Sequence, residues 1–226
     1  MRKIAILCDF DGTVARDDVG NLLFRSFSEN ESALDVVAEW KAGKISSREC
    51  LEREAALANV DKAELDRFIR QRKIDPYFKD FHDFACKRGV EVAILSDGLD
   101  YYIEQILLRN GLGGIKFFSN HLSIADNTLH VSFPHYNKLD CTDCGCCKTH
   151  HLRRYRTEGC YIIYVGDGMS DRCPAEEADL VFAKGDLLSH CRKKGIDHVE
   201  FANFRDVERE VLRRIFLDGE FQAAGD

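Results

Sequence analysis

Two carboxylates stand one residue apart at the end of an apolar run near the start of the chain. The run Ile6-Leu7-Cys8 is followed by Asp9-Phe10-Asp11-Gly12. Carboxylates held together repel unless a cation lies between them or one of them binds a proton. Oxygen ligands of this kind favour Mg²⁺, whose remaining positions go to water and to a phosphate oxygen. A calcium-binding loop is excluded, because position twelve counted from Asp9 is Gly20, where that loop needs a glutamate.

Three further polar segments that could join this site lie downstream in the sequence. Ser96-Asp97-Gly98 follows the apolar run 90–95, and residues 166–171 (GDGMSD) follow the apolar run 161–165, while Lys148 opens a helical segment between them. In an open α/β sheet, ligands collect beyond the carboxyl ends of the strands. We therefore expect these groups to meet Asp9 and Asp11 at one edge of a sheet, with Asp167 as a third oxygen ligand.

Each of these residues also has a purely structural interpretation. Ser96 could cap the helix that is expected near Leu99, since serine is a favoured capping residue. Lys148 could be one of many solvated lysines, and Asp171 could be an acidic residue favoured by a helix dipole. Asp9, Asp11 and Asp167 are the strongest candidates of the set.

The elements that must position these residues are short strands alternating with helices. Apolar runs of four to six residues occupy 3–8, 90–95, 161–165 and 180–183. Apolar residues at three-to-four spacing indicate helices in the intervals, at 33–40, 48–58, 63–69, 78–85 and 101–108. This alternation predicts an α/β fold with a mainly parallel, Rossmann-like sheet covered by helices on both faces.

One long segment interrupts the alternation. Residues 14–75 contain no convincing strand, so we interpret them as a helical cap inserted after the first strand, with residues 1–13 and 76–226 forming the core domain. Within 120–133 the pattern LSIADNTLHVSF predicts two short strands about an Asp-Asn turn. On one helical face of the insertion, Asp18, Asn21 and Arg25 either look into a pocket or form cap surface.

Composition limits the class of protein. The chain has 226 residues, of which 45% are hydrophobic and 31% charged, with a net charge of −7 and a pI of about 5.6. This acidity argues against nucleic-acid binding, and no apolar stretch predicts a membrane span or a signal peptide. We expect a cytoplasmic monomer or homodimer with a small-molecule partner, in which any phosphate site is created locally.

Four of the ten cysteines form one cluster, Cys141, Cys144, Cys146 and Cys147, with His135, His150 and His151 nearby. In a reducing compartment such a cluster favours metal or redox chemistry over disulfides. Four sulfurs match the ligand number of a structural Zn²⁺ site. Zinc sites, however, normally draw ligands from two separate segments, so a redox-sensitive cluster and simple packed thiols remain alternatives.

The four motifs together resemble the haloacid dehalogenase superfamily of aspartate-nucleophile phosphatases. The resemblance rests on DFDGT (residues 9–13), the serine of LSDG, the downstream lysine and GDGMSD, and it spans nearly the whole chain. The insertion after the first motif is similar to the cap of the phosphoserine-phosphatase-like branch. The resemblance implies a Mg²⁺-dependent phosphomonoesterase that acts on a small phosphorylated metabolite.

The resemblance also implies a role for each motif residue. Asp9 would attack phosphorus and form an aspartyl-phosphate, and Asp11 would exchange protons with the leaving group and with water. Ser96 and Lys148 would contact the phosphate, assisted by the backbone at Asp97 and Gly98. Asp167 would bind Mg²⁺ with Asp9 and the backbone carbonyl of Asp11. Asp171 would bind it directly or through water and Lys148.

Finer resemblances point to a substrate. The cysteine-rich CxxCGCCK ending at Lys148, with Phe133-Pro134-His135 before it, resembles the 2-hydroxy-3-keto-5-methylthiopentenyl-1-phosphate phosphatases of methionine salvage. GDGMSDRCP is also similar to phosphoethanolamine/phosphocholine phosphatases. Asp18 stands where phosphoserine phosphatases carry an amine-binding glutamate, a departure that makes phosphoserine a weaker alternative, although a shorter carboxylate could still meet an amine. A non-catalytic zinc- or redox-responsive protein and a phosphonatase using Lys41 or Lys44 are the remaining alternatives.

Overall fold

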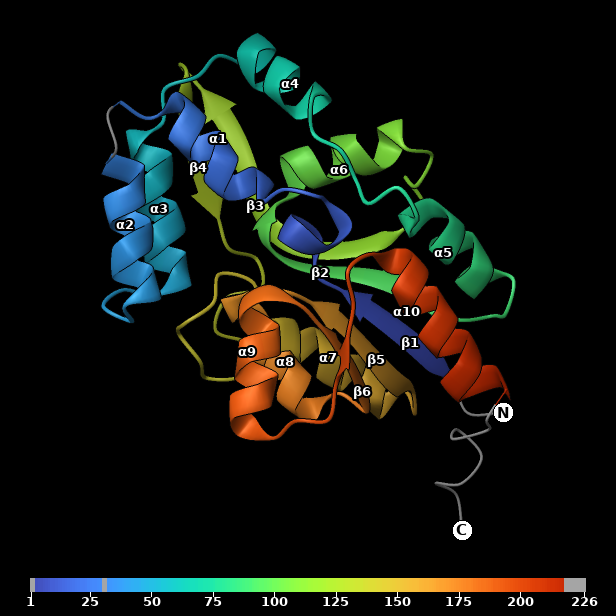
Figure 1. Cartoon of the computed structure of the whole chain (residues 1–226). Coiled ribbons are helices and arrows are strands. Elements are labelled where there is room, and N and C mark those ends of the chain that lie inside the picture. Colours follow the sequence, from blue (N-terminus) through green and yellow to red (C-terminus); the bar gives the residue numbers. More distant parts are fainter. Residues whose placement is uncertain (1–2, 30–31, 218–226) are drawn as a thin grey trace.

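Seven strands form one sheet in the order β4-β3-β2-β1-β5-β6-β7 in the computed structural model, which describes residues 3–29 and 32–217 (Figure 1). Neighbouring strands are parallel except for the antiparallel pair β3–β4. The strands are β1 (Ile4–Cys8), β2 (Glu91–Leu99), β3 (Lys116–Ala125), β4 (Thr128–Ser132), β5 (Tyr161–Gly166), β6 (Leu180–Ala183) and β7 (Val199–Glu200). The four strands expected from the apolar runs are therefore confirmed.

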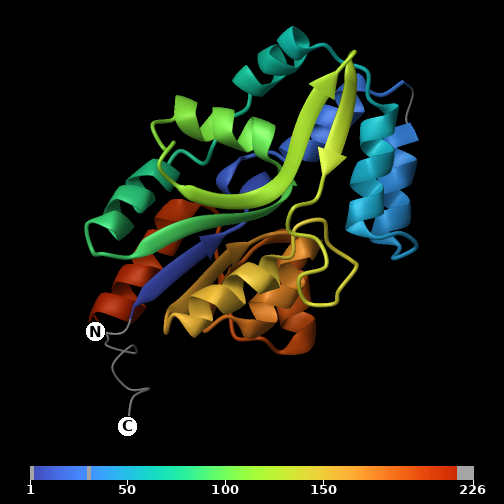
Figure 2. The same cartoon turned by 180° about the vertical axis from the view of Figure 1, so that it is seen from behind.

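Helices cover both faces of the sheet (Figures 1 and 2). Successive side chains of a strand point to opposite faces, so Ile6 and Cys8 of β1 join one core, while Ala5 and Leu7 join the other. The first core is completed by α5 (Phe78–Cys86), α6 (Asp100–Arg109) and α10 (Phe204–Val211). The second is completed by α7 (Lys148–Thr157), α8 (Arg172–Glu177) and α9 (Gly185–Lys194).

The insertion is helical in its described part, as expected. It contains α1 (Val19–Phe27), α2 (Ser32–Lys41), α3 (Ser47–Leu57) and α4 (Lys62–Arg70). Three of these helices begin where a side-chain oxygen accepts a hydrogen bond from a backbone N–H of the first turn, namely at Asp18, Ser46 and Asp61. The two ends of the insertion lie side by side, because Ala15 pairs with Ile74.

The hairpin β3–β4 extends from the edge of the sheet towards α3 (Figure 2). Its turn is formed by Asp126 and Asn127, whose φ angles of 49° and 59° are ones that Asp and Asn tolerate. The predicted pair of strands is confirmed, but β3 begins at Lys116 because Lys116, Phe117 and Phe118 also pair with β2. Asn59 after α3 bridges Thr128, so the hairpin connects the sheet to the helical insertion.

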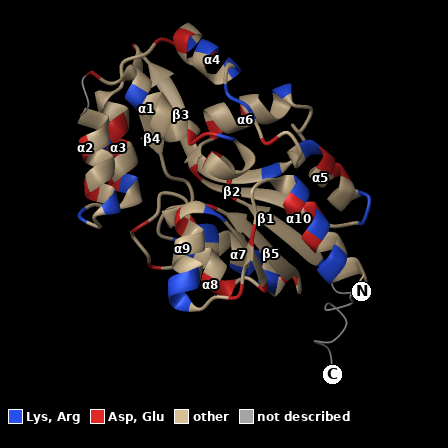
Figure 3. Cartoon of the chain, in the orientation of Figure 1, with Lys and Arg blue, Asp and Glu red and all other residues tan. Residues whose placement is uncertain are grey.

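Acidic and basic residues interleave along the outer helices (Figure 3). Lys79 and Asp83 on α5, for example, lie 2.9 Å apart. Exposed pairs of this kind contribute little to stability, so they form a solvated surface. Within the described ranges, no helix combines the length and the apolar character needed to cross a bilayer.

Candidate active site

Residues from separate strands meet at the carboxyl edge of the sheet. Asp9 follows β1, Ser96 lies near the end of β2 and Asp167 follows β5. Because β1 pairs with both β2 and β5, the three side chains line one cavity of about 270 Å³. The fourth predicted motif residue, Lys148, begins α7 and does not line the cavity itself, but its Nζ contacts Asp9, which does.

Lys148 is the central cation of the site. It is 2% exposed, and its Nζ donates to Asp9 Oδ1 at 2.5 Å and to Asp171 Oδ1 at 2.6 Å. Burial alone lowers the pKa of this ammonium, but the carboxylates of Asp171 and Asp9 outweigh that effect and raise it well above its usual value. The interpretation of Lys148 as a solvated surface lysine is therefore wrong.

Asp171 holds Lys148 and the loop after β5 in place. Its side chain is fully buried and accepts hydrogen bonds from the Tyr164 hydroxyl at 2.6 Å and from the backbone N–H groups of Asp167 and Gly168 at 3.0 and 2.9 Å. It makes no side-chain capping bond to α8. Its contacts are those of a residue that positions the ammonium and the Asp167 backbone.

Three carboxylates form a potential cation site. Among the described residues, only Asp9, Asp167 and Asp171 place three ligand atoms of His, Cys, Asp or Glu within 4.8 Å of one another. Burial and neighbouring carboxylates raise the pKa of Asp9 and of Asp167, although Lys148 opposes the effect. Crowded oxygen ligands of this type fit a hard dication such as Mg²⁺. Thr13 orients Asp167 through a hydrogen bond of 2.6 Å.

The carboxylate of Asp11 is not part of that cluster. Metal binding by the backbone carbonyl of Asp11 stays a prediction. The carboxylate accepts from the Tyr102 hydroxyl at 2.5 Å and from the Val19 N–H at 2.8 Å. The chain turns at Gly12, where φ is 75° and a Cβ would lie 2.5 Å from Asp167 Oδ2. Burial, together with Asp18, raises the pKa of Asp11 to about 7, a value suited to proton transfer near neutral pH.

Ser96 faces the cavity and does not cap the following helix. Its Oγ accepts from the Gly98 N–H at 2.9 Å, whereas the N-cap residue of α6 is Leu99. Gly98 is required here, because a Cβ at this position would collide with the Tyr102 hydroxyl and with Asp11. The Ser96 hydroxyl and the last residues of β2 are thus held at the cavity floor.

Asp97 ties three parts of the molecule together. Its carboxylate accepts from the Cys146 N–H at 2.7 Å, from the Asn120 side chain at 3.2 Å and from the Ser47 hydroxyl of α3. Burial raises the pKa of Asp97, and these hydrogen bonds oppose that effect. The Asp97 side chain therefore fixes the loop before Lys148 and the start of α3.

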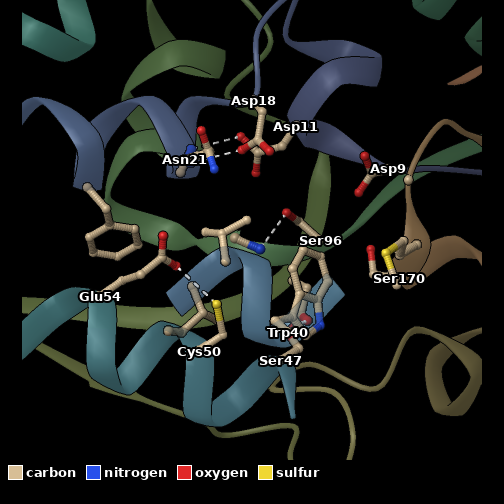
Figure 4. A pocket seen from close by; sticks show the side chains of 18 of the residues that line it. Asp9, Asp11, Asp18, Asn21, Trp40, Ser47, Cys50, Glu54, Ser96 and Ser170 are labelled. Atoms are coloured by element: carbon tan, nitrogen blue, oxygen red, sulfur yellow. Dashed lines mark hydrogen bonds between the residues drawn. The ribbon is translucent and has the colours of Figure 1, made fainter. Parts of the chain in front are cut away.

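The side of the cavity away from the strand ends is formed by α1, α2 and α3. Asp18 accepts from the Asn21 N–H at 2.9 Å and lies beside Asn21, with Glu54 and Cys50 facing them from α3 (Figure 4). Burial raises the pKa of Asp18. Asp18 and Asn21 line the cavity as the sequence allowed, whereas Arg25 does not. Glu54 was missed, because a glutamate within a helix is normally a surface residue.

The predicted zinc set is not assembled. Cys141 is exposed, Cys144 is half-buried, and Cys146 and Cys147 are buried. In the described part of the chain, no three of these sulfurs lie within 4.8 Å of one another. The loop is held by its backbone instead, since Cys146 N–H binds Asp97 and Cys147 is the N-cap residue of α7. The loop leads directly into Lys148 at the start of α7. A redox response of the cysteine thiols stays a prediction.

A buried histidine lies beside this loop. His151 is 1% exposed, stacks on Phe118 with ring centroids 3.9 Å apart and packs against His135 at 4.5 Å. Neither ring nitrogen has a hydrogen-bond partner among the described residues. Burial, followed by the neighbouring His135 and His150, lowers the pKa of His151 to about 3. The ring is therefore neutral in the folded protein at physiological pH.

Replacing His151 with phenylalanine is expected to stabilise the protein more at pH 5 than at pH 8. Below pH 6.5 the unfolded chain binds a proton that folded His151 rejects, so the histidine lowers the free energy of unfolding there. The difference between the two pH values should be about 1–2 kcal/mol, measured by urea denaturation. The exposed His130→Phe serves as the control, and an equal effect of His151→Phe at both pH values would contradict a neutral buried ring.

The sheet, the four motif positions and the inserted helices define the class of protein. Residues 6–176 match the haloacid dehalogenase-like hydrolase family, and the chain belongs to this family. It is a phosphatase, that is, a phosphoric monoester hydrolase.

Particular relatives are similar over nearly the whole chain. The 2-hydroxy-3-keto-5-methylthiopentenyl-1-phosphate phosphatase of Bacillus velezensis is 32% identical over 93% of this chain and 90% of its own length. The enzyme of the same name from Geobacillus kaustophilus is 31% identical over 91% and 94%. Among solved structures, a phospho-aspartyl intermediate analogue of phosphoserine phosphatase superposes with a TM-score of 0.72, at 21% identity, over 93% of this chain and 99% of its own. This last likeness concerns the fold.

Proposed function

We propose that this phosphatase is Mg²⁺-dependent, works through an aspartyl-phosphate on Asp9, and hydrolyses 2-hydroxy-3-keto-5-methylthiopentenyl 1-phosphate. One observation carries the mechanism: the Asp9 carboxylate lies at the floor of the cavity, held by the Lys148 ammonium at 2.5 Å and next to Asp167. The substrate is the one named for the curated relatives. Their match over more than nine-tenths of this chain supports the assignment.

Each step can be assigned to a residue of the chain. Asp9 attacks phosphorus, which divides a difficult displacement into two easier ones. Lys148 and the Ser96 hydroxyl stabilise negative charge on the transferring group. Asp11 donates a proton to the leaving oxygen and then accepts one from the hydrolytic water. Mg²⁺, held by Asp9 and Asp167 and near Asp171, would neutralise charge on the phosphate oxygens.

We also propose that residues 14–75 act as a cap domain on a core made of residues 1–13 and 76–226. The cavity walls support this division, because its floor comes from the strand ends and its far side comes from α1, α2 and α3. The cap side is therefore the part that contacts the organic half of a phosphomonoester. A cytoplasmic location and a monomeric or homodimeric state stay predictions.

A phosphometabolite panel tests the proposal. The enol phosphate of methionine salvage should be hydrolysed with a kcat/KM at least about tenfold above those for phosphoethanolamine, phosphocholine and phosphoserine. Removing Mg²⁺ with EDTA should lower the rate by about 100-fold or more, and added Mg²⁺ should restore it. Preference for an amine-bearing phosphate, or full activity in EDTA, would contradict the proposal.

A further inference from the structure

The cap end of the cavity has an apolar part beside polar side chains that include Lys41. The apolar part of its walls comes from three helices, with Phe24 on α1, Val37 and Trp40 on α2, and Leu51 on α3. Hydrocarbon walls of this kind bind an alkyl or thioether tail by removing its surface from water. One carboxyl group, that of Glu54, is set into this wall, and Figure 4 shows it directed from α3 towards the side of the cavity that holds Asn21 and Asp18.

Glu54 is buried without an adequate partner. The residue is 4% exposed, and its Oε1 has no hydrogen-bond partner among the described residues. Its Oε2 accepts only a weak bond from the Cys50 thiol, at 3.5 Å. A buried polar group that lacks a hydrogen bond is costly, so this oxygen is free to be satisfied by a ligand.

The charges around Glu54 favour its neutral form. Burial, with the Asp18 carboxylate of α1 as a further cause, raises the pKa of Glu54 to about 7, and the Cys50 bond opposes this only in part. Lys41 of α2 also lines the cavity and lowers the pKa of Asp18. With a pKa of about 7, Glu54 is partly ionised near neutral pH, and its ionised fraction and Asp18 would repel a second anion, against the attraction of Lys41.

We propose that Glu54 is a specificity-determining residue that hydrogen-bonds an uncharged oxygen, hydroxyl or carbonyl, in the organic half of the substrate. The site therefore takes oxygenated alkyl phosphomonoesters with a short apolar tail and rejects those with a second anionic group. This inference rests on the proposed function and deepens it. It concerns a residue whose role the motif pattern does not suggest.

The hydrogen-bonding capacity of this part of the cavity separates this class from amine-bearing substrates. An ammonium group has three N–H donors to satisfy, whereas Glu54 offers one oxygen without a partner, Oε1, and one that accepts a weak bond from the Cys50 thiol. Oδ1 of Asp18 accepts from the N–H of Asn21. A single hydroxyl or carbonyl matches the one free oxygen, and a protonated carboxyl can donate to it or accept from it.

Two substitutions at Glu54 separate hydrogen bonding from packing and charge. Glu54→Gln keeps the shape and the hydrogen-bonding ability, and Glu54→Leu removes both polar atoms. For the methionine-salvage enol phosphate, Glu54→Leu should lower kcat/KM by about tenfold, mainly through KM, because one hydrogen bond to a neutral group is lost. The kcat/KM of the Glu54→Gln enzyme should stay within about threefold of the parent value. The exposed Glu52→Gln on the same helix is the control and should match the parent enzyme.

A parallel series with phenyl phosphate, O-phosphoserine and O-phosphoethanolamine completes the test. The loss caused by Glu54→Leu should be about tenfold smaller on phenyl phosphate, which has no oxygen in its organic half beyond the ester oxygen. Both Glu54 variants should reduce the difference in kcat/KM between the enol phosphate and O-phosphoserine, since the ionised fraction of Glu54, which repels the phosphoserine carboxylate, is gone. Equal losses on all substrates would overturn the inference alone. A parent enzyme that prefers O-phosphoethanolamine and loses that preference in Glu54→Gln would overturn both the inference and the proposed substrate. A parent enzyme inactive on every phosphoester with Mg²⁺ would overturn the proposed function as well.

Discussion

Asp9→Asn is expected to lower kcat by about 10⁴-fold or more, as for the removal of a nucleophile in other enzymes. The amide has nearly the same shape as the carboxylate but cannot attack phosphorus to form an acyl phosphate. The measurement is steady-state hydrolysis of the enol phosphate and of p-nitrophenyl phosphate. Acid quenching with a ³²P-labelled substrate should also trap label on the parent protein and none on the variant.

The variant should remain folded. Lys148 keeps its bond of 2.6 Å to Asp171, and removing one of three crowded carboxylates relieves the repulsion that raises the pKa of Asp9. We expect the free energy of unfolding to change by no more than about 1–2 kcal/mol. Asp80→Asn, exposed on α5, is the matched control. Trapped phosphate on the Asp9→Asn protein, or turnover within tenfold of the parent, would rule out Asp9 as the nucleophile.

Lys148→Met is the second large effect, because it should damage both stability and catalysis. Methionine retains most of the buried stem but leaves Asp9 and Asp171 without their cation. Breaking a buried ion pair on one side costs about 3–5 kcal/mol, which urea denaturation would detect as a lower midpoint. The rate should fall by about 10²–10³-fold, since charge on the transferring phosphoryl group is no longer balanced.

A double substitution distinguishes lost charge compensation from poor packing. In Lys148→Met with Asp171→Asn, one of the two uncompensated carboxylates is removed, so part of the lost stability should return. The coupling energy from the four-protein cycle should be about 1–3 kcal/mol. The exposed Lys138→Met should leave stability and rate unchanged. A coupling energy near zero would show that Lys148 does not stabilise these carboxylates.

The architecture could be read from local patterns. A strand buried on both faces needs a continuous apolar run. Such runs predicted the bounds of β1, β5 and β6 to within one residue, whereas β2 continues to Leu99, beyond its predicted end at residue 95. The strand β7 was not predicted, because a pair of residues, Val199 and Glu200, has no periodicity. The start of β3 was also missed, since Lys116 and its neighbours are strand residues only through pairing with β2.

The sequence also identified the candidate site residues, but it did not identify the side chains that they contact. Asp9 and Lys148 are 139 positions apart, and only the packing of α7 against β2 and β5 turns a common lysine into a buried cation. Asp171 joins the crowded carboxylates from the segment after β5, and the Asp11 carboxylate meets Tyr102 of α6, which packs in the other core. No local pattern contains these distances.

The sequence by itself determined the order of strands and helices, the helical insertion and the acids at the strand ends, because each depends on residues close together in the chain. Tertiary structure decided which carboxylates gather and that the clustered cysteines separate. It also decided that Glu54 lies in the wall of the cavity rather than on the surface. These outcomes depend on desolvation and on distances between elements, and both arise only when the helices of the insertion and the edge of the sheet pack together.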